Sequence, residues 1–360
     1  MLILLLGIAP TTEVPVPPRW EPRETPAGLA LLQAELRRRG LLPLGMLAAA
    51  RAAIAQPRAA LDGLRAHAVG TGQLLQLALQ PGAETPLNGD TGPNRRLGTF
   101  RVELSAVKRI KRNLGGTIND AVLAITGGAL RRFFEMRGLQ PAGDVRALIP
   151  VSTRSDVESG TLGNKLAVLA ASLAIREPDP RKRLEAARRA RGGLKSSEIA
   201  RGNELLTMAA EWTHPRLLAQ TLKIAMRLRS AHLMVTNMRG PADPLYFLDA
   251  PLLEVYPAAP LWPGQTLTVG VLSYGDWLHW GFAADADHVP DVDQFVDAVR
   301  AEVHELAKIA SEVEALAGGA SREASTRRPA DEPPRPRTLR AGAPRKLRLA
   351  SRPAPSPPAE

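Results

Sequence analysis

The spacing of apolar positions changes along the chain from a helical period to a strand-like one. Between residues 27 and 79, leucine and alanine recur at helical spacing, interrupted by glycine and proline, which predicts two or three helices joined by short breaks. Residues 97–104 instead alternate apolar with charged positions, as a half-buried strand does. A short basic helix should follow, and then a long helix from about Asp120 to Met136, which has one apolar side and ends before Gly138.

Strands and helices alternate through the second half of the chain. The charged residues 179–195 predict an exposed helix with Leu184 inward, and residues 292–316 predict a closing amphipathic helix. A hairpin is expected around Tyr274-Gly275-Asp276. The predicted strands are residues 145–151, 166–175, 231–237, 252–256, 267–273 and 277–283. The pattern therefore predicts an α/β (α+β) fold.

Proline-rich and glycine-rich stretches divide the chain into four parts. Prolines crowd residues 10–26 and exclude helix and central strand there, and residues 81–96 read as a loop. After Gly318 the chain holds almost no aromatic or β-branched residues, so residues 319–360 are expected to be disordered. The expected parts are 1–26 (an apolar run and linker), 27–85 (helical), 86–318 (the α/β unit) and 319–360 (the tail).

Composition excludes several classes of site. The 360 residues are 44% hydrophobic, which is enough for a sizeable core. No cysteine is present, so disulfides, thiolate catalysis and Cys-based zinc sites are excluded, and a reducing cytoplasm fits. The apolar run Met1–Pro10 lacks a basic residue before it and is too short to cross a bilayer, so neither secretion nor a transmembrane helix is expected.

The basic charge is concentrated in the predicted tail. The net charge is +11, and residues 319–360 hold ten basic and four acidic side chains. Such a tail could contact anionic lipid head groups, contact nucleic acid without specificity, or have no partner at all. We favour no specific nucleic-acid partner and keep a peripheral membrane or lipid-droplet contact as an alternative.

The common catalytic motifs are missing. Six histidines are spread along the chain without HExxH spacing, so no metal site is predicted. The sequence also has no GxSxG, Walker or GxGxxG motif, which leaves hydrolase, NTPase and dinucleotide-binding readings without support.

Several ordered motifs resemble the bacterial wax ester synthase/diacylglycerol acyltransferase family, from about Trp20 to Leu316. Residues 116–124 (GTINDAVLA) look like the family's "NDV-L" helix, and residues 236–241 (TNMRGP) resemble its "TNVPGP" turn. The other similar stretches are 128–132, 147–154, 162–164, 256–261, 272–275 and 281–285. Several matches in the right order indicate kinship more strongly than any single one.

The resemblance implies a chloramphenicol-acetyltransferase-like fold, in which two related lobes enclose a tunnel for acyl-CoA and an alcohol. In this reading residues 27–85 are the remnant of the first lobe and its crossover, and residues 86–318 are the C-terminal lobe. The family uses an HHxxxDG motif whose second histidine deprotonates the acceptor hydroxyl, an effect worth about a hundred- to ten-thousandfold in rate. This sequence has no adjacent histidine pair, and its first 20 residues resemble the stretch that follows the motif. We therefore expect an N-terminally truncated chain, through a late start codon or a shortened gene, with an incomplete first lobe.

None of the histidines is a convincing substitute for the missing base. His279 falls in a strand pattern and His288 in an expected loop, so a packed or solvated role is favoured for each. We therefore name no catalytic residue.

The candidate substrate-channel residues each have a structural alternative. Asn119 and Asp120 could shape the channel side of the long helix; alternatively, Asp120 or Thr117 caps that helix and Asn119 supports the preceding turn. The remaining candidates could contact substrate or serve only as turn and hairpin residues; they are Asn237, Gly240, Pro241, Ser273 and Tyr274.

The resulting hypothesis is an O-acyltransferase of triacylglycerol or wax ester synthesis, with acyl-CoA and diacylglycerol or a long-chain alcohol as substrates and no cofactor. It is expected to be cytoplasmic and inactive as written, because the histidine motif is missing. The alternative is a non-catalytic remnant of the family that binds a lipid surface or a partner subunit.

Overall fold

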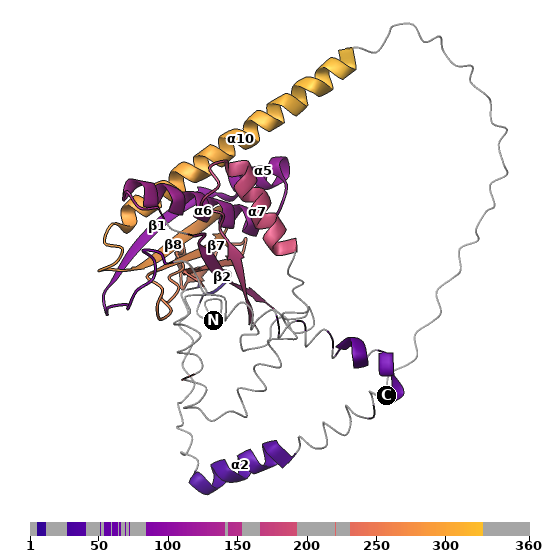
Figure 1. The fold of residues 1–360 in the computed structure, drawn as a ribbon, viewed down its shortest axis with the longest axis vertical. Coiled ribbons are helices and arrows are strands. Elements are labelled where there is room, and N and C mark those ends of the chain that lie inside the picture. The colour runs from indigo at the N-terminus through magenta and orange to yellow at the C-terminus, as the bar shows by residue number, and fades with distance from the viewer. Residues whose placement is uncertain are drawn as a thin grey trace, which may run out of the picture. The chain divides into compact units, whose positions relative to one another are not determined.

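A computed structural model describes residues 6–11, 27–40, short pieces between 51 and 72, 84–140, 143–152, 166–192, 220 and 231–326. The chain divides into two units, Met1–Ala315 and Leu316–Glu360. Within the first unit, the helices between residues 104 and 315 gather on one side of a mixed sheet (Figure 1). This is the mixed α/β architecture that the apolar pattern predicts.

The sheet has six strands in the order β1-β8-β7-β4-β2-β3. β7 pairs in parallel with β4, and β4 with β2, whereas the other neighbours are antiparallel. The strands are β1 (Arg95–Glu103), β2 (Arg146–Ser152), β3 (Leu166–Ser172), β4 (Leu233–Arg239), β7 (Leu267–Tyr274) and β8 (Trp277–Asp285). A separate two-stranded sheet joins β5 (Tyr246–Phe247) to β6 (Ala250–Pro251).

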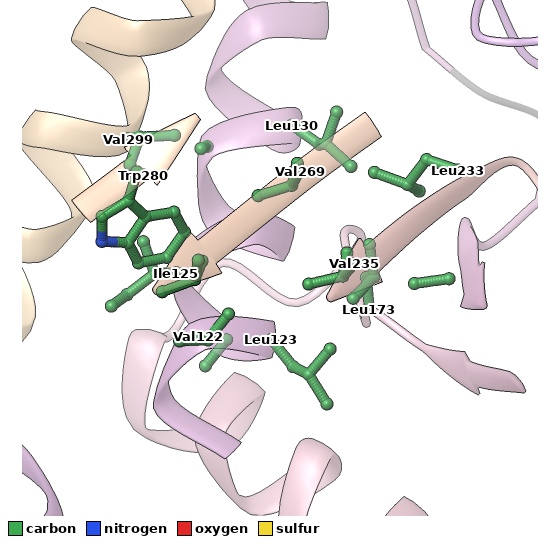
Figure 2. Packing of buried hydrophobic residues seen from close by; sticks show 14 of the residues in the cluster. Val122, Leu123, Ile125, Leu130, Leu173, Leu233, Val235, Val269, Trp280 and Val299 are labelled. Atoms are coloured by element: carbon green, nitrogen blue, oxygen red, sulfur yellow. The ribbon is translucent and has the colours of Figure 1, made fainter. Parts of the chain in front are cut away.

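One face of the sheet packs against helices to form the core. Trp280 and Phe282 of β8 meet Phe295, and the rings of Phe282 and Phe295 lie edge to face with centroids 5.4 Å apart. Figure 2 shows α6 residues against β4 and β7 in the same core. The helices are α5 (Leu104–Leu114), α6 (Ile118–Met136), α7 (Pro180–Gly192) and α10 (Val292–Thr326), and α2 (Gly28–Gly40) precedes them.

The opposite face of β7 and β8 is covered by residues 252–264, here called the cover segment. A Cβ on Gly281 would lie 2.0 Å from the carbonyl oxygen of Pro257, and one on Gly270 would lie 2.9 Å from the same atom. The Thr268 hydroxyl donates a hydrogen bond of 2.9 Å to the carbonyl of Ala259. Because glycines allow this close approach, the backbone of the cover segment lies directly on the sheet.

Most predicted elements are confirmed, with two corrections. The strand predicted over residues 252–256 is wrong, because this stretch crosses the sheet face instead of pairing along an edge. The helix predicted over 292–316 continues to Thr326, so the disorder expected from residue 319 is wrong for residues 319–326. The rest of the expected disordered tail, most of the linker over residues 10–26 and most of residues 41–83 lie outside the described residues.

Candidate functional site

The direction of α6 relative to the strands decides which predicted residues share one end of the fold. Arg137, the residue after α6, bonds to Asp291 and to the carbonyl of His288, just beyond the C-terminal end of β8. That end of β8 pairs with the start of β7, where Leu267 lies opposite Ala284. The C-terminus of α6 therefore lies where β7 begins.

The N-terminus of α6 consequently points the same way as the C-terminal ends of β4 and β7. Figure 2 shows this direction, since the path from Leu130 back to Val122 along α6 follows the path from Leu233 to Val235 along β4. The topology thus brings the predicted residues at the start of α6 and at the ends of β4 and β7 to one end of the two layers.

At the start of α6, a reciprocal cap holds the helix terminus. The backbone N–H of Thr117 donates to the Asp120 carboxylate at 2.8 Å, and the N–H of Asp120 donates to the Thr117 hydroxyl at 3.2 Å. Asp120 is fully buried, whereas Asn119 is partly exposed. The capping role of Asp120 and Thr117 is confirmed, and a channel role for Asn119 and Asp120 stays a prediction.

At the ends of β4 and β7, the turn after β4 is fastened to the β7–β8 hairpin. The N–H of Gly240 donates to the Ser273 hydroxyl at 3.2 Å, and the N–H of Gly275 donates to the carbonyl of Pro241 at 3.1 Å. A Cβ on Gly240 would lie 2.1 Å from the carbonyl oxygen of Ser273, so only glycine fits there. The turn role of Gly240 and Pro241 is therefore observed, and substrate contact stays a prediction.

Side-chain alternation separates Tyr274 from the other candidates. Asn237 lies opposite Val271 and Ser273 opposite Leu278, and both of these partners belong to the helix-facing core. Tyr274 faces the other way, where its hydroxyl accepts from the N–H of Leu245 at 2.9 Å and donates to the carbonyl of Leu252 at 2.8 Å. Asn237 and Ser273 therefore share the helix-facing side, and Tyr274 serves to anchor the chain around the cover segment.

At the other end of the strands lies a buried carboxylate that is not among the predicted site residues. Asp285 is fully buried and accepts hydrogen bonds from the Gly92 N–H at 2.8 Å and from Nδ1 of His288 at 2.7 Å. Burial by itself would raise the pKa of Asp285, but these bonds and further backbone N–H groups lower it overall. Gly89 and Gly92 were visible only as loop glycines; a Cβ on Gly89 would lie 2.2 Å from Nε2 of His288. This cluster ties the loop before β1 to the end of β8.

The described residues include no group of three or more histidine or acidic side chains placed to hold a metal ion. They also include no helix that combines the length and hydrophobicity needed to cross a membrane. Asn119, Asn237 and Ser273 stay predicted substrate-channel residues.

Two sequence models of one family match the chain. The one described as the wax ester synthase/diacylglycerol acyltransferase catalytic domain matches residues 4–122, and the one described as the WS/DGAT C-terminal domain matches residues 162–307. Together they cover the segments that form the candidate site, apart from most of α6.

Named relatives and a solved structure agree with this match. A Mycobacterium tuberculosis protein named a probable diacylglycerol O-acyltransferase is 31% identical over 71% of this chain and 56% of its own length. The O-acyltransferase WSD of Acinetobacter baylyi is 29% identical over 60% of this chain and 47% of its own length. The wax ester synthase/diacylglycerol acyltransferase structure from Marinobacter aquaeolei has a TM-score of 0.51 at 21% identity, over 68% of this chain and 57% of that one. The chain spans about half the length of the curated relatives it matches.

Proposed function

The chain belongs to the wax ester synthase/diacylglycerol acyltransferase family, and we propose that it forms the C-terminal lobe of an O-acyltransferase of neutral-lipid synthesis. The reaction would move an acyl group from acyl-CoA to diacylglycerol or to a long-chain alcohol. The observation that supports this proposal is the placement of Asn237 and Ser273 at the ends of neighbouring strands, at the end of the sheet toward which the start of α6 points.

Acyl transfer needs a general base, and this sequence does not contain the HHxxxDG motif that supplies the base in the family. The acceptor oxygen attacks the thioester carbonyl while its hydroxyl proton passes to a general base. The carbon–sulfur bond then breaks and the CoA thiol leaves, taking up a proton. The six histidines include no adjacent pair. We therefore expect the 360-residue chain alone to be inactive, with Asn119, Asn237 and Ser273 orienting substrate through hydrogen bonds.

The test is transfer from labelled palmitoyl-CoA to diacylglycerol and to hexadecanol. The chain would be assayed alone and together with a second polypeptide that carries the family's HHxxxDG segment. Transfer is expected only in the mixture, and Asn237→Ala should reduce it about tenfold or more, as expected when a hydrogen bond to a bound substrate is lost. Asn94→Ala is the matched control, because Asn94 is exposed just before β1, whose start pairs with the end of β8 at the opposite end of the strands.

Two results would contradict the proposal. Transfer by the chain alone would show that the histidine motif is dispensable. Absence of transfer in the mixture, combined with binding to lipid vesicles, would favour the non-catalytic alternative.

We also propose that the chain contacts an anionic lipid surface. Residues 319–360 carry ten basic and four acidic side chains, which favours anionic head groups. Co-sedimentation with phosphatidylglycerol vesicles should exceed that with phosphatidylcholine vesicles, and a chain ending at Leu316 should lose the difference. Equal sedimentation with both vesicles would contradict it.

A further inference from the structure

His279 occupies an unusual position in the middle of β8. Its side chain is fully buried, and neither Nδ1 nor Nε2 has a hydrogen-bond partner in the part of the chain that the structure describes. It points away from the helices, because its neighbours Leu278 and Trp280 face the core. A buried imidazole without hydrogen bonds is costly in its neutral form and far costlier when protonated.

The cover segment is what shields this imidazole from solvent. The rings of Tyr256 and His279 meet edge to face, with centroids 5.2 Å apart and planes at 82°. The next residue, Pro257, lies against Gly281 of β8. On the far side of His279, the ring of Tyr274 lies 6.3 Å away. Moving the cover segment would therefore expose His279 first.

The charged groups around His279 offer no free acceptor for an added proton. Arg101 is its cross-strand partner on β1, stacks over the Trp277 ring at 4.4 Å, and forms an ion pair with Glu254. The hydroxyl of Tyr256 donates to the same Glu254 carboxylate at 2.8 Å. The acidic group nearest to His279 is thus already engaged by Arg101 and Tyr256.

We propose that His279 is a pH-sensitive latch for the cover segment. While the imidazole is neutral, residues 252–264 lie on the sheet; when it takes up a proton, the segment releases and the imidazole becomes solvated. Gly270 and Gly281 lie against Pro257 and have no side chains to obstruct it, so the cover segment can return to the sheet.

The direction of the pH effect depends on whether the pKa of His279 is higher in the closed or in the open state. Burial and the nearby Arg101 lower the pKa of His279 in the closed state, and Glu254 opposes them only in part. In the open state the imidazole returns to the ordinary value of about 6.5. Closure is therefore fully favoured above that value and weakens as the pH falls below it. If the closed form binds no proton at pH 5.5, the open fraction rises about tenfold between pH 7.5 and 5.5.

Hydrogen–deuterium exchange of the intact chain tests the latch directly. Protection of the Leu252 amide, which donates to the carbonyl of Leu245 at 2.7 Å, should fall about tenfold between pH 7.5 and 5.5 after correction for intrinsic exchange. His279→Phe keeps a ring against Tyr256 but cannot titrate, so its protection should be independent of pH. His304→Gln is the matched control, because His304 is exposed on α10 and its loss should leave the pH dependence intact.

A pH-independent wild-type cover segment, or the same loss of protection in His279→Phe, would overturn the proposal. Should that variant fail to fold, the imidazole titration of the wild type, followed by NMR with labelled histidine, decides instead. The His279 midpoint should lie below the ordinary value, while protection should begin to fall near the ordinary value; an ordinary midpoint would refute the latch.

Discussion

Replacing Glu302 by alanine is expected to destabilise the fold strongly. Glu302 lies on α10 with its side chain 1% exposed, and its carboxylate pairs with Arg183 of α7 and with Nε of Arg132 on α6 at 2.9 Å. Arg183 is itself only 3% exposed. One carboxylate thus joins three helices at a dry site.

The magnitude follows from what remains after the carboxylate is removed. Arg183 keeps Nη1 bonds to the carbonyls of Glu177 at 2.7 Å and Pro178 at 3.0 Å, but its Nη2 loses the acid. Its Nε already lacks a partner among the described residues. Breaking a buried ion pair by removing one member costs about 3–5 kcal/mol, because a charge is left buried and uncompensated. Replacing both members by apolar residues should cost much less.

Urea denaturation followed by far-ultraviolet circular dichroism measures the effect. Glu302→Ala should lose about 3–5 kcal/mol, whereas Glu305→Ala, whose side chain is 40% exposed and pairs with Arg132, should lose about 1 kcal/mol or less. The double change Arg183→Met with Glu302→Leu should recover much of the loss. Equal effects of the two alanine variants, or no recovery in the double variant, would refute a buried and uncompensated charge as the cause.

Three further changes test other parts of the fold. Gly127→Ala places a Cβ 2.1 Å from the carbonyl of Leu173 and should cost about 1–3 kcal/mol in the same denaturation assay; a neutral effect would contradict this contact. Thr117→Ala removes the hydroxyl that accepts from the N–H of Asp120 and should cost about 0.5–2 kcal/mol; an unchanged midpoint would argue against the cap. Because the pKa of Asp285 is lowered in the folded state, its contribution is complete above its ordinary value of 3.8 and is lost as the pH falls through the lower, folded-state value. Asp285→Asn should therefore be less stable at neutral pH and lose less stability on acidification, and parallel pH profiles would contradict the inference.

The elements with a clear period were predictable, and those shaped by distant contacts were not. The apolar positions of α6 and the alternation in β1 reflect one-sided burial, which leaves a mark in the local sequence. Residues 252–256 also look apolar and extended, yet their position is set by the glycines at 270 and 281, far along the chain. Those two glycines were the available signal, since a glycine inside a strand often marks a close backbone approach.

The candidate site, too, was predictable from the sequence only in part. Motif spacing singled out Asn119, Asn237 and Ser273, and the parallel pairing of β4 with β7 places the last two on neighbouring strands. Strand alternation could have excluded Tyr274 from that side, because it follows Ser273 directly. The burial of His279 and of Glu302 depends on residues from several other elements, so no local pattern could reveal it.

The two faces of the sheet also separate the two proposals physically. Asn237 and Ser273 lie on the helix-facing side, at the ends of their strands, whereas His279 lies on the opposite side beneath Tyr256. Neighbouring residues of a strand point to opposite faces, so a change at Asn237 alters no side chain that packs against the cover segment. Failure of the acyl-transfer test would therefore leave the latch standing, and a pH-independent cover segment would leave the substrate role of Asn237 standing. Each proposal rests on its own face of one sheet.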